Sequence, residues 1–314
     1  MRRPRVTKKE REEPSASTPT GSRRAVPEGG GGGGAGSSAA VAPVEAQPGS
    51  PSKGWGRPIE PHPGWELHLE RIKAMRSPGG CAYPAVVDSM GCERCADPSA
   101  PAPVQRFQTL VSLMLSSQTK DEVTYAACQR LKDGLGASGG FTAAGVAGAT
   151  LETLGQLIYP VGFWRNKAKF LQAAGRDCVE RCGGDIPESV EGLCALKGVG
   201  PKMAFICMAA AWGKNVGIGV DTHVHRIANR LGWVRTDAPQ QTQAHLQAWL
   251  PRAEWDALNL LLVGFGQSTC TPIGPKCGTC SAQEVCPFYA GKAKSVEEAA
   301  AAAASARPSG GEGQ

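Results

Sequence analysis

The sequence lacks any long apolar run. Its longest, Ala204–Trp212, is far shorter than the about 20 residues that a membrane-spanning helix needs. The N-terminus, which begins MRRPR, also lacks the apolar core of a secretory signal. We therefore expect no membrane span, no membrane partner and no export into an oxidising compartment.

The sequence also lacks strand signals, because no segment alternates apolar and polar residues with period two for long enough. Apolar residues recur instead at three-and-four spacing, as at Phe107, Leu110, Val111 and Met114. This spacing is typical of one buried helix face. The sequence predicts an all-α fold of many short helices, at 104–116, 119–132, 151–159, 165–181, 190–196, 202–212, 222–231, 241–250 and 254–263.

The two ends of the chain have compositions that cannot bury enough apolar surface to fold. Residues 1–62 contain a basic head, a glycine run at 29–34 and a Pro/Ala/Ser-rich stretch. The last residues, 291–314, are rich in alanine and glycine. We expect both tails to be disordered.

The basic head is typical of an import signal or of a DNA-binding arm, although a merely soluble tail can have the same composition. Nuclear import is the simpler interpretation, because Glu10, Glu12 and Glu13 weaken a mitochondrial presequence. We expect the nucleus, with the mitochondrion as the second location. The net charge of +6 permits a nucleic-acid partner without requiring one. The basic residues of the head are Arg2, Arg3, Arg5, Lys8, Lys9 and Arg11.

Twelve cysteines are many for a chain without a secretory signal. In a reducing compartment they are more often metal ligands or buried small side chains than disulfides. Cys270, Cys277, Cys280 and Cys286 form a C-x6-C-x2-C-x5-C pattern in a loop rich in proline and glycine. Four thiolates can hold either zinc or an iron–sulfur cluster, and the spacing alone does not separate the two. The isolated CxxC at 92–95 has no partner cysteines nearby in sequence, and we interpret it as incidental.

The segment LKGVGPKMA at 196–204 lies between two predicted helices. Gly198 and Gly200 allow a tight turn with positive φ, and Pro201 suits the first position of the next helix. Uncovered N–H groups at a helix start bind anions such as a nucleic-acid phosphate. The pattern predicts a helix-hairpin-helix, and an ordinary helix–helix turn with two glycines is the alternative.

Lys202 and Asp221 are candidate catalytic residues. Lys202 falls in the first turn of its helix, where the helix dipole and partial burial would both disfavour the ammonium form. A free amine is what imine-forming catalysis needs, whereas most lysines are simply solvated or contact phosphate. Asp221 is either a plain N-cap or a carboxylate that stabilises a sugar cation and accepts the lysine proton. His223 and His225 lack the i, i+4 spacing of a helical metal pair, so we expect them to be structural or DNA-facing.

Three patterns in this order resemble one family: the hairpin LxGVGPKxA, the segment VDTHVHR and the cysteine loop. LMLSSQTKD at 113–121 is similar to the eukaryotic form of the same family. The resemblance covers about 106–287 and is to the endonuclease III branch of the helix-hairpin-helix DNA glycosylases. It implies two helical lobes, one being a barrel domain at 103–215. The other, 63–102 plus 216–290, would carry a [4Fe–4S] cluster on the four cysteines of the loop.

The resemblance also implies an activity and a site. The chain would be a bifunctional DNA N-glycosylase and AP lyase of base excision repair, with Lys202 as nucleophile and Asp221 as its essential carboxylate. Its partner would be double-stranded DNA with oxidised pyrimidines, such as thymine glycol, or abasic sites. We expect a monomer whose N-terminal tail contacts other repair proteins. The implied DNA contacts are Gly198, Val199, Gly200, Gln118, Lys276 and the wedge loop 159–163.

Two positions depart from the family pattern. Lys197 replaces the usual proline before the first glycine, which would add a phosphate contact or loosen the turn. Gly219 replaces an expected alanine, a change that should mainly affect loop stiffness. The alternatives to the implied activity are a non-catalytic DNA-binding scaffold, a zinc-binding adaptor and an adenine-mismatch glycosylase. The last of these lacks the catalytic lysine.

Overall fold

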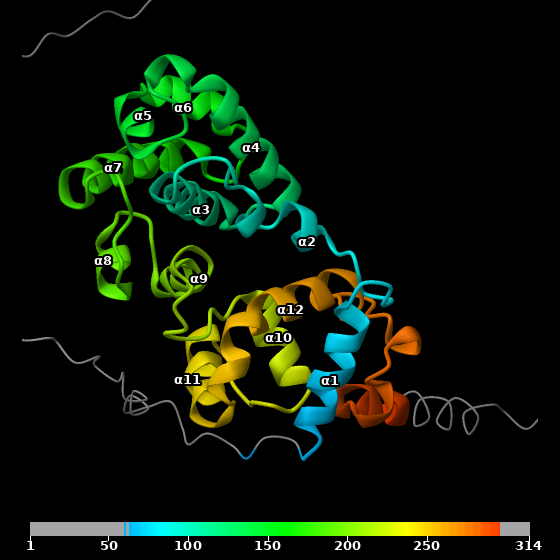
Figure 1. The fold of residues 1–314 in the computed structure, drawn as a ribbon. Helices are drawn as coiled ribbons and strands as arrows, with labels where there is room; N and C mark the ends of the chain where they lie inside the picture. The colour runs from blue at the N-terminus through cyan, green and yellow to red at the C-terminus, as the bar shows by residue number, and fades with distance from the viewer. Residues whose placement is uncertain (1–59, 61–62, 296–314) are drawn as a thin grey trace, which may run out of the picture. The chain divides into compact units, whose positions relative to one another are not determined.

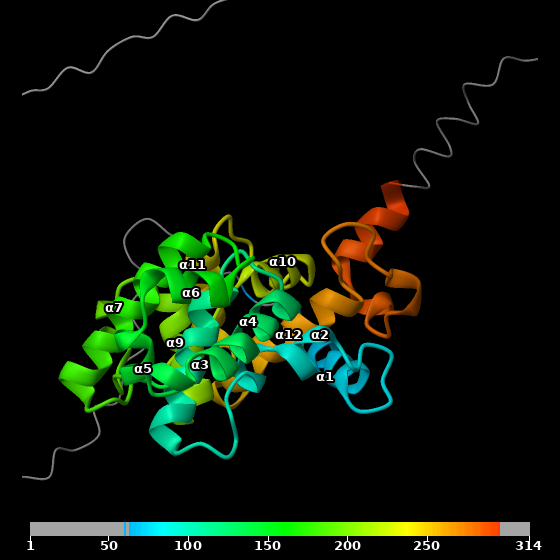
Figure 2. The ribbon, with the colours of Figure 1, turned by 90° about the horizontal axis from the view of Figure 1, so that it is seen from above.

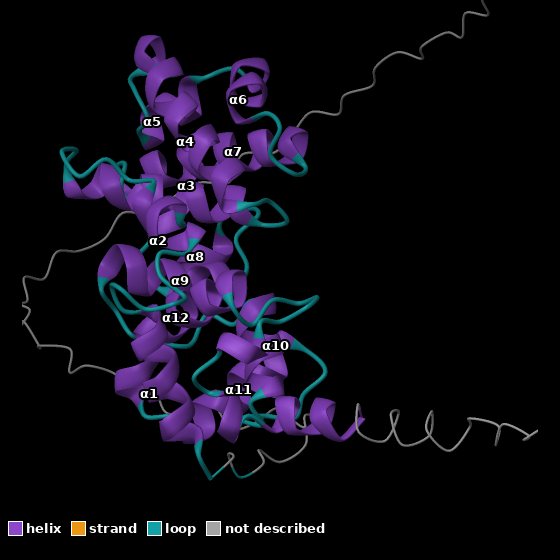
Figure 3. Cartoon of the chain, turned by 90° about the vertical axis from the view of Figure 1, so that its right-hand side faces the viewer, coloured by secondary structure: helices purple, strands orange, loops and turns teal. Residues whose placement is uncertain are grey.

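The computed structural model describes residue 60 and residues 63–295. Helices joined by loops make up this part of the chain, which contains no strand (Figure 3). The prediction of helices alone is therefore confirmed for the described residues. None of the helices in these ranges has both the length and the apolarity needed to cross a membrane. The basic head and most of both predicted tails lie outside the described residues.

The nine predicted helices are all present, with ends that differ from the prediction by a few residues. The helices are α1 (Trp65–Arg76), α2 (Val86–Met90), α3 (Ala102–Ser116), α4 (Asp121–Gly134), α5 (Ala143–Gly148), α6 (Leu151–Ile158), α7 (Trp164–Cys182), α8 (Val190–Ala195), α9 (Pro201–Trp212), α10 (Thr222–Arg230), α11 (Pro239–Trp249) and α12 (Trp255–Ser268). Residues 287–295 are also helical. This corrects the predicted C-terminal tail, whose first residues, 291–295, belong to that helical segment.

Helix α5 was not predicted, because its sequence AAGVAG has low helix propensity. Two local features stabilise it. The Thr142 hydroxyl accepts a hydrogen bond from the backbone N–H of Gly145 at 3.0 Å and so caps the helix start. Gly175 of α7 lets the two helices pack closely, since a Cβ there would lie 2.8 Å from the Ala143 carbonyl oxygen. Tertiary packing thus overrides weak propensity.

The buried apolar residues form two main clusters. One runs from Cys95 to Met208 and includes the buried faces of α3, α4, α7 and α9. The other combines Leu69–Ala82 with Ile218–Ala282, from α1, α10, α11 and α12. Figure 1 shows α3–α7 grouped together with α8 and α9 beside them, and α1, α10, α11 and α12 grouped separately.

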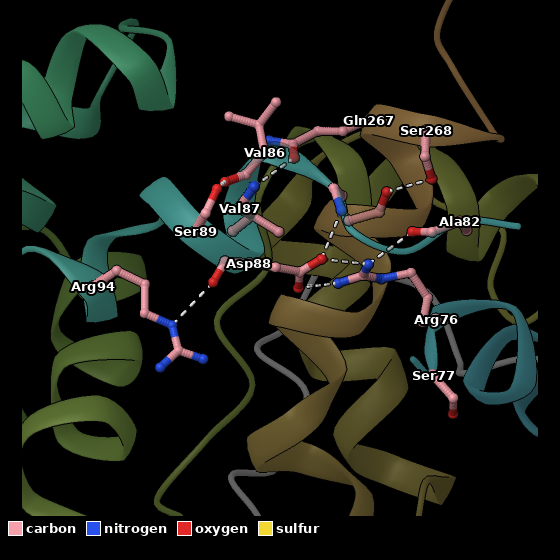
Figure 4. Close-up of polar contacts among 12 residues, drawn as sticks. Arg76, Ser77, Ala82, Val86, Val87, Asp88, Ser89, Arg94, Gln267 and Ser268 are labelled. Carbon is pink, nitrogen blue, oxygen red and sulfur yellow. Dashed lines mark hydrogen bonds and ion pairs between the residues drawn. The ribbon is translucent and has the colours of Figure 1, made fainter. Parts of the chain in front are cut away.

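An ion pair near the end of α1 fixes α2 beside α12 (Figure 4). The Arg76 guanidinium donates to both carboxylate oxygens of Asp88, at 2.6 and 2.8 Å, and lowers the pKa of that carboxyl. The absence of a side chain at Gly264 of α12 makes room, because a Cβ there would lie 2.2 Å from the Arg76 guanidinium carbon.

Gln267 of α12 forms hydrogen bonds to both α2 and α4. Its Oε1 accepts from the backbone N–H of Val87 in α2 at 3.0 Å, and its Nε2 donates to Asp121 Oδ2 in α4 at 2.8 Å. Asp121 belongs to the segment that follows α3, so this one side chain positions the start of α4 against α12.

Candidate active site

The predicted helix-hairpin-helix is present between α8 and α9. Gly198 has a φ of 91°, and a Cβ there would lie 2.7 Å from the Phe170 ring. The Val199 N–H donates to the Leu196 carbonyl at 3.1 Å and closes the turn, while the Val199 side chain is buried in the core. Of the three residues expected to hold a phosphate, Val199 therefore already uses its amide within the turn. Gly200 is the N-cap of α9.

Lys202 follows Pro201 in the first turn of α9, as expected from the sequence. Its side chain is exposed, so the expected partial burial is wrong. The cause is local: Pro201 and Lys202 both lie on the outer side of the first turn, while Ala204, Cys207 and Met208 provide the buried face of α9. An amine in this place is open to a reactant that arrives from solvent.

Asp221 is the N-cap of α10. Its Oδ1 accepts a hydrogen bond from the Val224 N–H at 2.8 Å, which leaves Oδ2 as the second carboxylate oxygen. Burial lowers the pKa of the neighbouring His223, with the charge of Asp221 opposing this shift and the charges of Arg226 and Lys202 adding to it. The charges of Asp221 and Lys202 therefore both influence the pKa of the His223 imidazole, in opposite directions.

Two side chains at this site were not predicted to belong to it. His223 Nδ1 lies 3.2 Å from Arg226 Nη2, and the charges of Asp221 and Lys202 both affect the pKa of His223. Burial raises the pKa of Asp121, with the Gln267 hydrogen bond opposing the shift and the charge of Asp221 reinforcing it. Nothing in the local sequence signals that Asp121 and Asp221 influence each other.

Gln118 and the loop 159–163 form a second part of the site. Gln118 is exposed and has a φ of 51°, the left-handed region that is uncommon for a residue with a side chain. The Gly162 N–H donates to Thr119 Oγ1 at 3.1 Å and ties the two loops together. Tyr159 and Phe163 of this loop are 60% and 63% exposed. A cavity of about 300 Å³ is lined by Gln118, Phe163, Lys167, Phe170, Gly198 and their neighbours.

The four cysteines of the C-terminal loop line one pocket and form no disulfide. Figure 2 shows this orange-to-red segment next to α12 and away from α5 and α7. Cys280 and Cys286 are more buried than exposed, and burial raises the pKa of both thiols, that of Cys280 to about 11. The Arg230 guanidinium lies 3.4 Å from Cys270 Sγ and donates to the Thr271 carbonyl at 2.8 Å. Lys276, the expected DNA contact, is exposed.

The donor set of this pocket fits a group that takes four thiolates. All four cysteines line one space, and a guanidinium close to Cys270 would offset the negative charge of such a group. Within residues 60 and 63–295, however, no three His, Cys, Asp or Glu side chains are already arranged to share one metal ion.

Comparison with known proteins identifies the family. Residues 111–252 match the model of the HhH-GPD superfamily base excision DNA repair protein. Endonuclease III-like protein 1 of Gallus gallus is 49% identical over 78% of this chain and 83% of its own length. The Bos taurus protein of the same name is 51% identical over 72% of each chain. The chain belongs to the endonuclease III family.

The fold agrees with this assignment. A solved structure described as a trapped endonuclease III–DNA covalent intermediate, an estranged-adenine complex, matches with a TM-score of 0.61, covering 75% of this chain and all of that one. Its sequence is 24% identical, so this match concerns the fold. The protein is thus an endonuclease III-like DNA glycosylase of base excision repair.

The structure shows the contacts of Gly219 and Lys197, the two departures from the endonuclease III pattern. A Cβ at Gly219 would lie 2.3 Å from Ile206 Cγ1, so this glycine matters for packing against α9 as well as for loop stiffness. The Lys197 side chain is exposed, with Nζ 5.9 Å from the centre of the Phe170 ring. That contact lies on the outside of the hairpin, beside the Gly198 turn.

The isolated CxxC motif lies in the core of this endonuclease III relative. Cys95 and Cys128 are fully buried and hydrogen-bond to each other, and Cys92 packs against the same cluster. Burial raises the pKa of the Cys92 thiol to about 12. A thiol with a pKa this high is protonated at neutral pH and acts as a small apolar side chain.

Proposed function

We propose that the protein removes oxidised pyrimidines, such as thymine glycol, from duplex DNA and then cuts the strand as an AP lyase. The observation that carries this proposal is the placement of Lys202 in the exposed first turn of α9 together with Asp221 at the N-cap of α10. The charges of both residues influence the pKa of the partly buried His223 imidazole. The fold relative trapped as a covalent intermediate with DNA supports a covalent step of this kind.

The first step would be attack of the neutral Lys202 amine on C1′ of the damaged nucleotide. The C1′–N bond breaks, and the base leaves with the electron pair and gains a proton. Asp221 stabilises the positive charge that develops at the sugar and accepts the proton that Lys202 loses. Its Oδ1 stays bonded to the Val224 N–H, so Oδ2 is the oxygen that serves this role.

The sugar ring then opens: the C1′–O4′ bond breaks, O4′ gains a proton, and the lysine nitrogen forms an imine with C1′. The second step would be β-elimination from this lysine imine. The imine acidifies the C2′ proton, and its removal expels the 3′ phosphate from C3′. The products are an unsaturated imine of the sugar, still joined to Lys202, and a strand that begins with a 5′-phosphate. Water then releases the aldehyde and regenerates the amine.

The surrounding residues would hold the DNA. The hairpin Gly198–Gly200 binds a backbone phosphate, and Lys276 contacts a second one. Gln118 fills the space left by the flipped nucleotide while Phe163 wedges into the opposite strand. Oxidised pyrimidines stack poorly and flip at lower cost, which contributes part of the selectivity.

Cys270, Cys277, Cys280 and Cys286 would hold the [4Fe–4S] cluster. It would stabilise the loop that presents Lys276 to DNA and would take no part in bond breaking. We propose further that the protein acts as a monomer in the nucleus, with the mitochondrion as a second location, and that the N-terminal tail contacts other repair proteins.

A strand-cleavage assay tests the proposal. A duplex with one thymine glycol is incubated with the wild type, with Lys202→Gln and with Lys214→Gln. Lys214 is a matched control, because it follows the other end of α9 and pairs with Glu188 on the surface. We expect nicked product with an unsaturated aldehyde terminus from the wild type and Lys214→Gln, and none from Lys202→Gln.

The alternatives give different products. A non-catalytic scaffold binds the duplex without releasing base, and an adenine-mismatch glycosylase releases adenine opposite oxidised guanine. A zinc adaptor contains zinc and no iron or sulfide. The presence of both Lys202 and Asp221 argues against a scaffold, which needs neither residue.

A further inference from the structure

Lys167 is a buried lysine of α7 that the mechanism above does not use. It is 6% exposed, and its Nζ donates to the carbonyl oxygens of Leu115 at 2.7 Å and Ser117 at 2.6 Å. A longer contact of 3.3 Å reaches Thr119 Oγ1. All three acceptors are uncharged, and Lys167 forms no ion pair within the described part of the chain.

The three acceptors surround Gln118. Leu115 and Ser117 lie at the C-terminal end of α3, where carbonyl groups have no partner within the helix and the helix dipole favours a cation. Thr119 follows Gln118, and its Oγ1 also accepts from the Gly162 N–H. One ammonium group therefore contacts the end of α3 and the turn around Gln118. Through the Thr119 hydroxyl, it is also linked to the wedge loop.

Two features of this arrangement are energetically unfavourable, the buried charge of Lys167 and the backbone conformation of Gln118. Burial lowers the pKa of Lys167 to about 8, so the folded chain keeps a desolvated charge here at neutral pH. The left-handed conformation of Gln118 is strained for a residue with a Cβ. Strained backbone of this kind persists only where surrounding contacts hold it. Those contacts include the Lys167 bonds to Ser117 and Thr119 on either side of Gln118, together with the bond from the Thr119 N–H to the Ser116 carbonyl.

We propose that Lys167 is a positioning residue that holds the Gln118 turn in the conformation needed to enter the DNA duplex. The inference rests on the proposed function, because the entry of Gln118 during nucleotide flipping is part of it. Without the ammonium group, the turn relaxes and the flipped nucleotide is less well stabilised. The chemical step at Lys202 is untouched.

A double-mutant cycle with Gln118 tests this role. The single-turnover rate of thymine-glycol release is measured for the wild type, Lys167→Met, Gln118→Ala and the double variant. Lys167→Arg retains a charged donor. As a control, Lys73→Met removes a surface lysine that pairs with Glu254. Thermal unfolding confirms that each variant is folded, and 2-aminopurine beside the lesion reports flipping.

We expect Lys167→Met to lower both the release rate and the flipping signal, on the order of 10- to 100-fold. In the Gln118→Ala background, the same change should cost about twofold or less. Lys167→Arg should recover most of the rate, and Lys73→Met should resemble the wild type. If Lys167→Met does not fold, Thr119→Val takes its place in the cycle, because it removes the hydroxyl that receives Lys167 and Gly162.

Equal losses in both backgrounds would overturn the role of Lys167, as would an unchanged rate in folded Lys167→Met. A wild-type chain that releases no base would instead overturn the proposed function itself. The two failures are therefore distinguishable.

Discussion

The Oδ1 atom of Asp221 accepts a hydrogen bond from the backbone N–H of Val224 at 2.8 Å. The carboxylate proposed for catalysis is therefore also the N-cap of α10. Asparagine caps a helix about as well as aspartate, whereas alanine does not cap at all. This difference makes the structural and the chemical role of Asp221 separable by substitution.

Asp221→Asn should keep the stability of the wild type and lose most of the activity. Asp221→Ala should lose the activity and also about 0.5–2 kcal/mol of unfolding free energy, because the cap is gone. Urea unfolding and single-turnover base release measure the two effects. Wild-type rates in folded Asp221→Asn would show that the residue is only a cap.

The sequence predicted α9, α10 and both candidate catalytic residues, because each lies in a short contiguous pattern. Pro201 and Asp221 mark their helix starts locally, and the spacing of apolar residues gives the buried faces. Helix α5 was not predicted, because its glycines lower the helix propensity of the segment.

Long-range contacts could not be predicted in the same way. Lys167 reaches Leu115 across 52 positions, and Gln267 reaches Asp121 across 146. No periodicity or motif marks such pairs, so sequence reasoning missed both the support of Gln118 and the proximity of Asp121 to Asp221. The division of the chain into a barrel domain at 103–215 and a flanking domain stays a prediction.

Gly219→Ala should destabilise the protein by about 1–3 kcal/mol. The added Cβ would lie 2.3 Å from Ile206 Cγ1, which is too close without a shift of α9. Ile206→Ala removes that atom, so the double variant should lose less stability than the sum of the single variants. Gly148→Ala is the control, since its Cβ would meet nothing within 4 Å. Additive losses would show that the steric account is wrong.

The stability gap between the wild type and Lys167→Met should change with pH. The pKa of Lys167 is about 8 in the folded chain, below its ordinary value of 10.5. Between these values the unfolded chain binds more protons, so the unfolding free energy of the wild type rises with pH relative to Lys167→Met. The gap should move in favour of the wild type by up to about 3 kcal/mol between about pH 7 and about pH 10. A constant gap would contradict the lowered pKa.

Loss of one thiol from the cysteine pocket should remove the bound group. Purified wild-type protein should contain iron and acid-labile sulfide in equal amounts, and Cys280→Ser should contain little of either. Cys128→Ser is the control, because Cys128 lies in the other core cluster. Zinc in place of iron would exclude the cluster and leave a zinc site on the same four residues.

Lys202 is proposed to form the covalent bond to DNA. Borohydride reduction during reaction with a thymine-glycol duplex, followed by proteolysis and mass spectrometry, locates the attached sugar on the chain. We expect a single adduct, on the peptide that contains Lys202. An adduct on Lys197 or on any other lysine, or base release with no adduct, would contradict it.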